Sequence, residues 1–521
     1  VEVRDRYEYT DEQGEEKVKY ILNKRETILA REKQAQVKAA FESWLFADND
    51  RGARLVKLYN DRFNNVRPRQ YDGSDLILPD MSGDIKLMKH QLDVVAHGLY
   101  GDGNLLAAHE VGAGKTFSAI AIAYEMKRIG AVNKPLIAVP NHLIGQWAAE
   151  FMRLYPGANI LVATEHDFEK SKRRRFCSRI STGDYDAIIM GHSSFELINL
   201  SRERQLLALE DEINEIMFAI DREKQMAGKT WSLKQMQIFQ KNLQSRYDKL
   251  YNADKKDDVV DFEELGVDMI IVDEAHAYKN YYTYSKMRNV AGIGQSSTQR
   301  AMDMHLKCQY INQINNGRGV VFLTGTPVTN SMSELFVMQR FLQPHELQKR
   351  GLLMFDAWAS TYGKVVTALE ITPEGNGYQM KTRFAKFHNL PELMAIFTQV
   401  ADIKTADMLN LPVPKLKGGE IEVVKTQPTQ FQKAVMDWLV DRAEAIHNGD
   451  VSSNEDNFLK LTLEARVAAV DPRILSPDAP DDDDTKLAVC AKRAAEIYPA
   501  PADKNLTQII FCDTGTPQED F

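Results

Sequence analysis

The sequence predicts an α/β fold with a doubly wound parallel sheet. Short apolar, β-rich runs alternate with helical stretches from about residue 84 to 345: LIAV at 136–139, DAIIM at 186–190, VDMIIVD at 267–273 and GVVFL at 319–323. Strands that are apolar along their whole length are buried on both faces, which is typical of a parallel sheet covered by helices. A polar signature follows each run, and a glycine loop follows a further segment, LLAAH. These polar residues lie at the carboxyl ends of the predicted strands, which is the edge of a parallel sheet where ligands bind.

The composition is that of a globular protein with several domains. The chain has 521 residues, of which 44% are hydrophobic and 27% are charged. It contains no run of about 18 apolar residues, so we expect no membrane span. Its N-terminus is highly charged, so we expect no signal peptide. The net charge of −9 argues against a surface coated in nucleic acid but permits a local basic groove. The four cysteines are widely spaced, which argues against a disulfide framework or a zinc site and favours a reducing, cytoplasmic location: Cys177, Cys308, Cys490 and Cys512.

Composition shifts divide the chain into four parts. Residues 1–80 are expected to be a helical extension and linker, 81–345 the sheet domain, and 346–475 a mainly helical extension. Residues 476–521 begin with an acidic linker and continue with a helix at 486–497 and a strand, LTQIIFC, at 506–512. We expect that strand to be buried and to start a second, incomplete sheet, because only nine residues follow Cys512 (521 − 512). Since the chain opens on Val1, we treat it as a piece of a longer protein.

Residues 201–258 interrupt the alternation of strands and helices. Their apolar residues repeat at spacings of three and four, which predicts a helical hairpin inserted in the sheet domain. One seam comprises Leu206, Leu209, Ile213, Ile216 and Ile220, and the second comprises Met236, Phe239, Leu243, Tyr247 and Leu250. The hairpin is either a solvated spacer packed on itself, which is the commoner case, or a contact for DNA or a partner.

The stretch HEVGAGKT, residues 109–116, has the pattern of a phosphate-binding loop whose leading glycine is replaced by His109. Glycines allow backbone N–H groups to turn towards phosphates, Lys115 supplies a positive charge, and the Thr116 hydroxyl can bind Mg²⁺. The following helix adds its positive end. The loop alone does not separate this interpretation from a structural glycine turn. The predicted nucleotide-binding residues here are Gly112, Ala113, Gly114, Lys115 and Thr116.

The tetrapeptide DEAH at 273–276 follows another apolar strand. Adjacent side chains point apart at a strand end, which suits two roles: Asp273 holds Mg²⁺ through water, and Glu274 polarises the attacking water. In isolation a surface charge cluster would be the better interpretation, but GAGKT upstream favours catalysis. Lys115, Asp273 and Glu274 are therefore the predicted catalytic residues, with ATP and Mg²⁺ as cofactors and with Thr116 and Asp273 as the metal ligands.

The order of these motifs resembles that of the superfamily-two helicases, whose loops commonly lack the leading glycine. It resembles more closely the Snf-type, chromatin-remodeller-like DNA translocases. The stretches LMKHQLDVV, PLIAVPNHLIGQWAAEF, DAIIMGHSSF, VDEAHAYKN and LTGTPVTNSMSELFVMQRFLQP carry this resemblance, which is strong from about 85 to 345. Over its whole length the chain is similar to large helicase proteins of bacterial conjugative elements and phages. An adenine-specific DNA methyltransferase region is often fused upstream in those proteins, although no N/D-P-P-[YF] motif occurs here.

The resemblance implies a RecA-like fold and further site residues. Gln91 would hydrogen-bond the adenine edge, unless it is an ordinary helix glutamine. His276 with the TGT segment would relay nucleotide state to DNA, the alternative being a plain turn before Pro327; the TGT residues are Thr324, Gly325 and Thr326. Four polar residues at or beyond strand ends would contact DNA phosphates: Asn141, His192, Ser193 and Asn330. The KRRR run at 172–175 is either a phosphate contact or, more commonly, a solvated face, and Trp147 and Trp358 are expected in the core.

The resemblance therefore implies an ATP-driven motor that moves along duplex DNA without processive strand separation. The alternatives are the motor subunit of a restriction system and a scaffold that binds nucleotide or DNA without hydrolysis. In such motors a second RecA-like lobe supplies arginines to the γ-phosphate, worth about 10³ to 10⁵ in rate. No Q-x-x-G-R-x-x-R pattern occurs in the chain. We therefore expect these residues to bind ATP but to hydrolyse it slowly unless the rest of the second lobe is present.

Overall fold

The computed structural model describes residues 3–10, 16–61, 69–227, 231–252, 260–281, 285, 287, 290–291, 293, 298–329, 331–371, 378–409, 411, 416, 418–448, 450–452, 455–476, 478–498, 507–512 and 514. The chain divides into two compact units. The first comprises Val1–Arg288, Gly292–Lys364 and Ala385–Asn410; the second comprises Asn289–Ala291, Val365–Phe384 and Leu411–Phe521. No helix among the described residues is long and apolar enough to cross a membrane.

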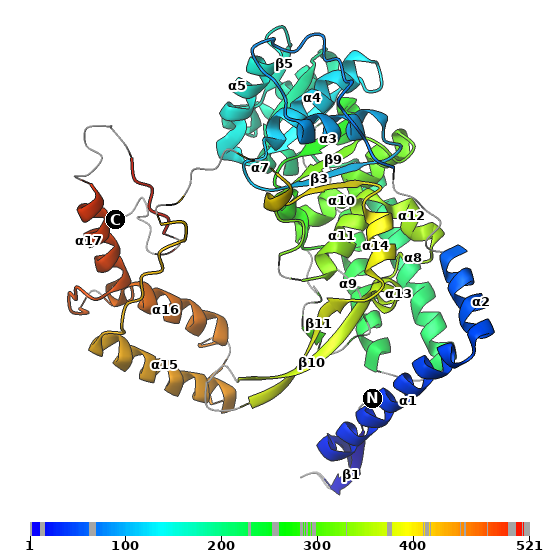
Figure 1. Ribbon diagram of the computed structural model, residues 1–521, viewed down its shortest axis with the longest axis vertical. Helices are drawn as coiled ribbons and strands as arrows, with labels where there is room; N and C mark the ends of the chain where they lie inside the picture. Colours follow the sequence, from blue (N-terminus) through cyan, green and yellow to red (C-terminus); the bar gives the residue numbers. More distant parts are fainter. Residues whose placement is uncertain are drawn as a thin grey trace. The chain divides into compact units, whose positions relative to one another are not determined.

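A seven-stranded sheet forms the centre of the first unit (Figure 1). Its strand order is β12-β3-β9-β7-β4-β6-β5, and every neighbouring pair is parallel. The strands are β3 (Leu105–His109), β4 (Pro135–Val139), β5 (Ile160–Val162), β6 (Ala187–Gly191), β7 (Met269–Val272), β9 (Val320–Leu323) and β12 (Ala401–Lys404). The predicted α/β fold with a parallel sheet is thus confirmed. The apolar runs of the sequence form β3, β4, β6, β7 and β9, whereas the short strands β5 and β12 were not predicted.

Helices cover both faces of the sheet. Alternate strand residues, such as Ile137 and Val139, pack in one apolar cluster with residues of α3 (Lys89–Tyr100), α4 (Lys115–Arg128) and α5 (Ile144–Leu154). The helix α10 (Gln299–Ile314) contacts β7 and β9 and lies on the side away from α4 (Figure 1). The other helices of this unit's core are α6 (Arg173–Thr182), α7 (His192–Glu196), α11 (Ser333–Leu342), α12 (Pro344–Lys349), α13 (Phe355–Tyr362) and α14 (Leu390–Phe397).

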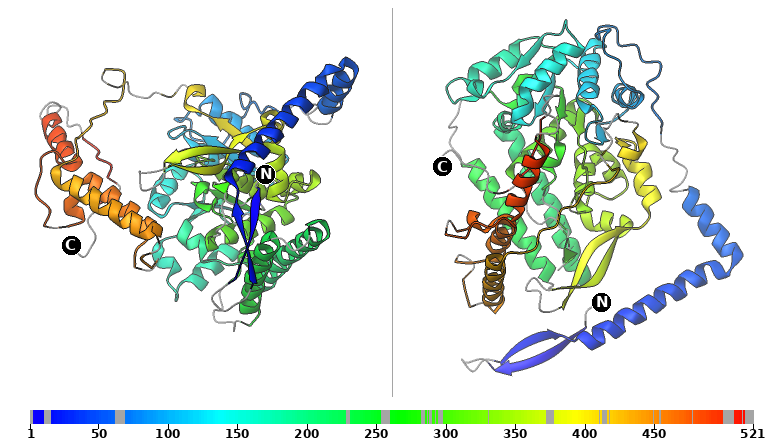
Figure 2. Two further views of the ribbon diagram at one scale, coloured as in Figure 1. Left: turned by 90° about the horizontal axis from the view of Figure 1, so that it is seen from below. Right: turned by 60° about the vertical axis from the view of Figure 1, so that its left-hand side comes forward.

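The predicted inserted hairpin is present between β6 and β7. It consists of α8 (Arg202–Ala227) and α9 (Trp231–Tyr251), which lie side by side (Figure 2). Eight of the ten predicted seam residues form a separate apolar core between the two helices: Leu209, Ile213, Ile216, Ile220, Met236 and Leu243, with Tyr247 and Leu250 packed against them. The three–four spacing therefore identified a real helix–helix interface.

The N-terminal segment differs from the expected helix at its start. The strands β1 (Arg4–Thr10) and β2 (Glu16–Leu22) form an antiparallel hairpin, dark blue in Figure 2. The helices α1 (Lys24–Ala47) and α2 (Asn49–Tyr59) follow. The strand is explained by the alternation of Lys17, Val18, Lys19 and Tyr20, because a period of two favours an extended strand over a helix.

Among its described residues, the second unit holds most of a small sheet and three α-helices. The sheet has the order β10-β11-β8, with β10 (Gly363–Ile371), β11 (Tyr378–Phe387) and β8 (Val290–Ala291), so the mainly helical extension also contains strands. The helices are α15 (Gln430–Asn448), α16 (Phe458–Val470) and α17 (Lys486–Ile497), the last at the predicted position. Arg442 on α15 contacts Asp456 and Glu464, which ties α15 to α16.

The predicted strand at QIIFC is wrong. Residues 507–512 have no regular secondary structure, and Ile509 and Phe511 are 76% and 90% exposed. A strand forms only where a neighbouring strand supplies hydrogen bonds, and nothing pairs with this run among the described residues. Apolar, β-rich composition alone is therefore not sufficient here.

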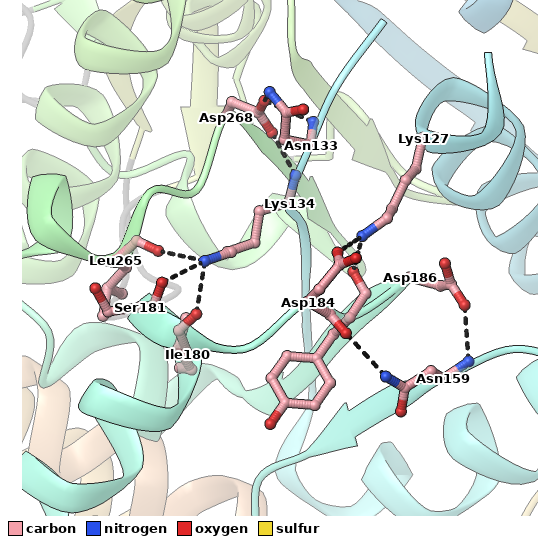
Figure 3. A network of polar contacts seen from close by, with 11 residues as sticks. Lys127, Asn133, Lys134, Asn159, Ile180, Ser181, Asp184, Asp186, Leu265 and Asp268 are labelled. Carbon is pink, nitrogen blue, oxygen red and sulfur yellow. Dashed lines mark hydrogen bonds and ion pairs between the residues drawn. The ribbon is translucent and has the colours of Figure 1, made fainter. Parts of the chain in front are cut away.

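A network of charges fastens the amino ends of the strands in the first unit (Figure 3). The Asp268 carboxylate, just before β7, accepts hydrogen bonds from the main-chain N–H groups of Asn133 and Lys134 at 2.7 and 2.8 Å, just before β4. The Lys134 ammonium donates to three main-chain carbonyls, of Ile180 at 2.7 Å, Ser181 at 2.9 Å and Leu265 at 3.2 Å.

The same edge continues to β6 and β5. The Lys127 ammonium, on α4, lies 2.5 Å from the Asp184 carboxylate and donates to the Tyr185 carbonyl at 2.7 Å. The Asp186 carboxylate accepts from the Asn159 N–H at 2.7 Å (Figure 3). These bonds link the segments that enter four strands, and they therefore hold the register of the sheet from its amino edge.

Candidate active site

The glycine loop follows β3 and leads directly into α4. Gly112 and Gly114 have φ of 83° and 76°, in the left-handed region that favours glycine. A β-carbon on Gly114 would also lie 2.4 Å from the side-chain nitrogen of Gln91. A β-carbon on Gly112 would meet nothing within 4 Å, so the loop is open on that side. The backbone thus curls at the N-terminus of a 14-residue helix, which is the usual cradle for an anion.

Two neighbouring side chains of α3 hold the loop from behind. The Gln91 amide nitrogen donates to the Gly114 carbonyl at 3.0 Å, and His90 Nε2 lies 2.8 Å from the Ala113 carbonyl oxygen. The Gln91 amide oxygen accepts from the Met88 N–H at 2.8 Å, as in a capping box. Gln91 therefore supports the loop backbone, a contact that the sequence interpretation missed, because it depends on the packing of α3 against the loop.

Lys115 points back towards the loop. Its ammonium donates to the main-chain carbonyls of His109 at 3.0 Å and Glu110 at 3.2 Å. Burial lowers the pKa of Lys115, and the nearby carboxylates of Glu274 and Asp273 act in the opposite direction. The lysine and the two predicted catalytic carboxylates therefore share one electrostatic environment. Thr116 is partly buried as the second residue of α4.

These residues fit a Mg²⁺–nucleotide. The loop offers an open concave backbone, a partly buried ammonium that donates to two main-chain carbonyls, and a hydroxyl at the helix start. Phosphate oxygens are stronger acceptors for an ammonium than neutral carbonyls are. The residues that would hold the phosphates are Gly112, Ala113, Gly114 and Lys115, and those that would hold Mg²⁺ are Thr116 and Asp273.

Asp273 and Glu274 lie directly after β7 but in different environments. Burial and, to a lesser extent, the charge of Glu274 together raise the pKa of Asp273 to about 6, although hydrogen bonds from the Glu274 N–H and the Trp147 side chain act in the opposite direction. Glu274 has φ 49° and ψ 47°, which is the left-handed region and rare for a residue with a side chain. Its side chain is 39% exposed. A strained, exposed carboxylate beside a buried one suits the two different roles predicted for them.

The segment after β9 lies between the loop and DEAH. His276 Nδ1 is 3.0 Å from Glu274 Oε2 and 3.3 Å from Thr324 Oγ1. The Thr326 N–H donates to Thr324 Oγ1 at 3.1 Å. A β-carbon on Gly325 would lie 3.1 Å from the Val111 side chain, so this segment approaches the glycine loop closely. Strand order explains the arrangement, because β9 lies between β3 and β7.

The polar residues beyond β4 and β6 separate into two groups. The Asn141 amide nitrogen donates to Ser193 Oγ at 2.7 Å, and the two side chains are exposed at the carboxyl edge. His192 turns inward instead, with Nε2 2.9 Å from the Asp273 carbonyl oxygen. Burial lowers the pKa of His192 to about 4. Asn330 lies outside the described residues.

Two other sequence alternatives can be placed. In the KRRR run, Lys172 forms an ion pair with Glu169 at 2.9 Å, and Arg173 donates to the Phe168 carbonyl at 3.5 Å. Trp147 and Trp358 are buried in the core, 1% and 0% exposed, as predicted. The hydrogen bond of Trp147 to Asp273 was not predicted, and a buried tryptophan on α5 gave no signal for it.

Residues 99–405 match the family described as "Probable helicase domain", which is more than half of the chain. The chain belongs to this helicase family. A second family, described as a "Domain of unknown function", matches residues 1–65, the segment that contains the β1–β2 hairpin, α1 and α2. The match of the helicase family includes the glycine loop, DEAH and the segment after β9.

The helicase chain is similar to named proteins. It is 26% identical over 477 residues to "Defense against restriction protein B" of Escherichia phage P1, covering 82% of this chain and 21% of that protein. It is 37% identical over 99 residues to the mouse "DNA excision repair protein ERCC-6-like", covering 18% of this chain and 8% of that protein. The chain thus spans about a fifth of the phage protein and under a tenth of the repair protein. The predicted kinship with helicases and the predicted similarity to a phage protein are confirmed.

Two solved structures of the Sulfolobus solfataricus SWI2/SNF2 ATPase core are also similar to the helicase chain. The core in complex with dsDNA has a TM-score of 0.33 at 16% identity, covering 82% of this chain and 67% of that chain. The core domain alone has a TM-score of 0.34 at 16% identity, covering 84% and 68%.

Proposed function

We propose that this chain is the ATP-binding half of a motor that hydrolyses ATP to move along duplex DNA. The observation that carries the proposal is the convergence at one sheet edge of the glycine loop, DEAH and the segment after β9. Lys115 shares its surroundings with Asp273 and Glu274, and His276 lies between Glu274 and Thr324. An ordinary glycine turn or a surface charge cluster would not require these contacts.

Each residue has a physical role in this proposal. ATP supplies a terminal phosphoryl group whose transfer to water releases the free energy that drives movement. Lys115 and the loop N–H groups bind and orient the phosphates, Thr116 and Asp273 hold Mg²⁺, and Glu274 orients and polarises the attacking water. Gln91 binds the adenine edge with the second amide hydrogen and the second oxygen lone pair, which its bonds to the Gly114 carbonyl and the Met88 N–H do not use.

The contact of His276 with Glu274 and Thr324 supports a coupling role for the segment after β9. A change of charge at Glu274 on hydrolysis would alter the contact of His276 with Thr324. The hydrogen bond from the Thr326 N–H to Thr324 would then transmit this change to the exposed turn that follows. Asn141 and Ser193, exposed at the same edge, are the proposed phosphate contacts for duplex DNA, together with Asn330; His192 turns inward to the Asp273 carbonyl and is not among them. We propose translocation rather than processive strand separation.

The mobile-element setting is also a proposal. The similarity to a phage protein named for defence against restriction supports a chain encoded by a phage or conjugative element. In such a protein an adenine-specific DNA methyltransferase region and the remainder of a second RecA-like lobe would be its covalent partners. The motor subunit of a restriction system remains the alternative, since it would use the same motifs; gene neighbourhood separates the two.

Nucleotide binding is the direct test of the site. We expect Mg²⁺-dependent binding of a fluorescent ATP analogue, and we expect Lys115→Ala to weaken it about 100-fold or more, because the lysine is the loop's only cation for the phosphates. Lys170→Ala, at an exposed position outside the site, is the matched control. Equal affinity in Lys115→Ala and in the native chain would remove the assignment.

Hydrolysis separates the motor from a non-hydrolysing scaffold. We expect the 521-residue chain to hydrolyse ATP slowly, with little gain from duplex DNA, because arginines from a complete second lobe are worth about 10³ to 10⁵ in rate. A longer chain with that lobe should show DNA-stimulated turnover. If the longer chain binds ATP but duplex DNA does not stimulate it, the scaffold is the correct interpretation.

A further inference from the structure

The carboxyl end of β3 leads into the glycine loop and pairs with the edge strand β12. Residue pairing runs from Ala401 beside Leu106 to Lys404 beside His109, so β12 accompanies β3 to the start of the loop. His109 is fully buried, and its Nε2 lies 2.7 Å from Asp402 Oδ2 on β12. This contact explains the residue that replaces the leading glycine, for which the sequence offered no role.

One peptide group connects the glycine loop with β12. The His109 carbonyl accepts from the Lys115 ammonium at 3.0 Å, and the Glu110 N–H donates to the Lys404 carbonyl at 2.9 Å. This C=O and this N–H belong to the same peptide unit, which is planar and rigid, so neither end can turn without the other. Hydrogen bonds in such a chain also polarise one another, and a cation on the carbonyl strengthens the N–H as a donor.

We infer that this peptide group and the His109–Asp402 pair relay the occupancy of the glycine loop to β12. The inference rests on the proposed function in one respect: a phosphate ligand is what draws Lys115 away from the His109 carbonyl. The Glu110 N–H then becomes a weaker donor, and the end of β12 loosens. The chain continues from Lys404 through residues 405–410 to the second unit, which begins again at Leu411, so β12 stands at the start of the connection between the two units.

Hydrogen exchange of the whole chain, measured peptide by peptide, tests the relay. Lys115→Met keeps most of the stem of the lysine and removes its charge. Without any nucleotide, we expect the Glu110 amide, and with it the amides of residues 400–410, to exchange about two- to tenfold faster in this variant than in the native chain, because the weakened bond from Glu110 to the Lys404 carbonyl holds the end of β12. Asp402→Asn should give a similar acceleration by loosening the side-chain tie. Asp407→Asn, exposed on the same segment, is the matched control and should match the native chain.

Adding Mg²⁺ and adenylyl imidodiphosphate to the native chain should change the rate of amide exchange in opposite directions in the glycine loop and in β12. Amides of residues 112–118 should slow, because the ligand covers them, while those of 400–410 should accelerate about two- to tenfold. In Asp402→Asn the slowing at 112–118 should persist, and the nucleotide should add less than twofold at 400–410, because β12 is already loose.

The outcomes separate the relay from the proposed function. Unchanged exchange at 400–410 in both Lys115→Met and Asp402→Asn overturns the relay, whatever the nucleotide does. Unchanged exchange at 112–118 with the analogue contradicts the proposed function, while the comparison of unliganded Lys115→Met with the native chain still decides the relay.

Discussion

The two edges of the seven-stranded sheet use the same kinds of charged residue in opposite ways. At the amino edge all three donors of the Lys134 ammonium reach carbonyls, and Asp268 accepts two main-chain N–H bonds. At the carboxyl edge Lys115 rests on two carbonyls, and Asp273 is buried beside a second carboxylate that raises its pKa. One edge is satisfied internally, whereas the other has charges that an external ligand would compensate better.

Backbone geometry shows the same contrast. At the carboxyl edge Glu274 occupies the left-handed region, which costs about 1 kcal/mol or more for a residue with a β-carbon. The residues of the amino-edge network have no positive φ. This contrast supports the proposal that the amino edge maintains the fold and the carboxyl edge binds the ligand. Variants at the two edges should therefore affect different measurements.

The largest expected effect is on hydrolysis at the carboxyl edge. Glu274→Gln removes the carboxylate that polarises water and should lower the ATPase rate of a chain with a complete second lobe about 10³-fold, or about 4 kcal/mol. Nucleotide affinity and thermal stability should stay within error, because the amide keeps the shape. Glu264→Gln, exposed at the amino edge, is the control. A rate within tenfold of the native one would contradict the role of Glu274.

The second effect should appear at the amino edge and in stability alone. Asp268→Ala leaves the Asn133 and Lys134 N–H groups without their acceptor and should cost about 3 kcal/mol of unfolding free energy, measured by urea denaturation. Binding of a fluorescent nucleotide to the folded variant should be unchanged. The exposed Asp75→Ala should be neutral. If Asp268→Ala lowered the nucleotide affinity without lowering the free energy of unfolding, the roles assigned to the two edges would be wrong.

A smaller loss is expected for Lys134→Met. The methionine retains the apolar stem but leaves three carbonyls without the ammonium, which should cost about 2 kcal/mol of unfolding free energy. Part of this cost is offset, because burial lowers the pKa of Lys134 and the native charge is itself partly desolvated. Lys170→Met serves as the exposed control in the same denaturation experiment. A stability equal to native would show that these contacts do not hold the edge.

The smallest effect concerns pH and a residue belonging to neither edge. His305 on α10 is buried between Tyr281 and Phe341, and burial lowers its pKa well below the usual value. Below about pH 6.5 the His305 side chain takes up a proton in the unfolded chain but not in the folded chain. The free energy of unfolding therefore keeps its full value above that pH and falls as the pH is lowered, by about 1 kcal/mol at pH 5.5. His305→Phe should reduce the loss of stability between pH 7.5 and pH 5.5, measured from thermal melting curves at the two pH values. An unaltered loss of stability would contradict it.

The sequence predicted those parts of the site that depend on strand ends. Lys115, Asp273, Glu274 and Thr324 each follow an apolar run, and parallel topology brings such positions to one edge. The inserted hairpin was likewise predictable, because its seam repeats over several turns. Gln91 illustrates the limit: its place in the site was expected, but its bond to the Gly114 carbonyl depends on how α3 packs, and that packing is not encoded in local spacing.

The parts that were missed have weak local signals. The strand β12 has four residues, ADIK, with only alternating apolar character, and it forms because the exposed edge of β3 offers it hydrogen bonds. The contact of His109 with Asp402 joins residues 293 apart in the chain. Conversely, QIIFC has a strong strand composition but no neighbour among the described residues. Strand formation at these two places was decided by tertiary pairing rather than by propensity.

The hairpin α8–α9 has a consequence for how this fold can change over evolution. Its two ends meet, since the Arg202 side chain contacts the Tyr251 carbonyl, and it carries its own apolar core. The connection from β6 to β7 must in any case pass over β4, which lies between them. A module that enters and leaves at one place can therefore be lengthened, exchanged or deleted at a small cost in loop closure. The catalytic framework and its accessory surface can thus diverge at different rates within one gene.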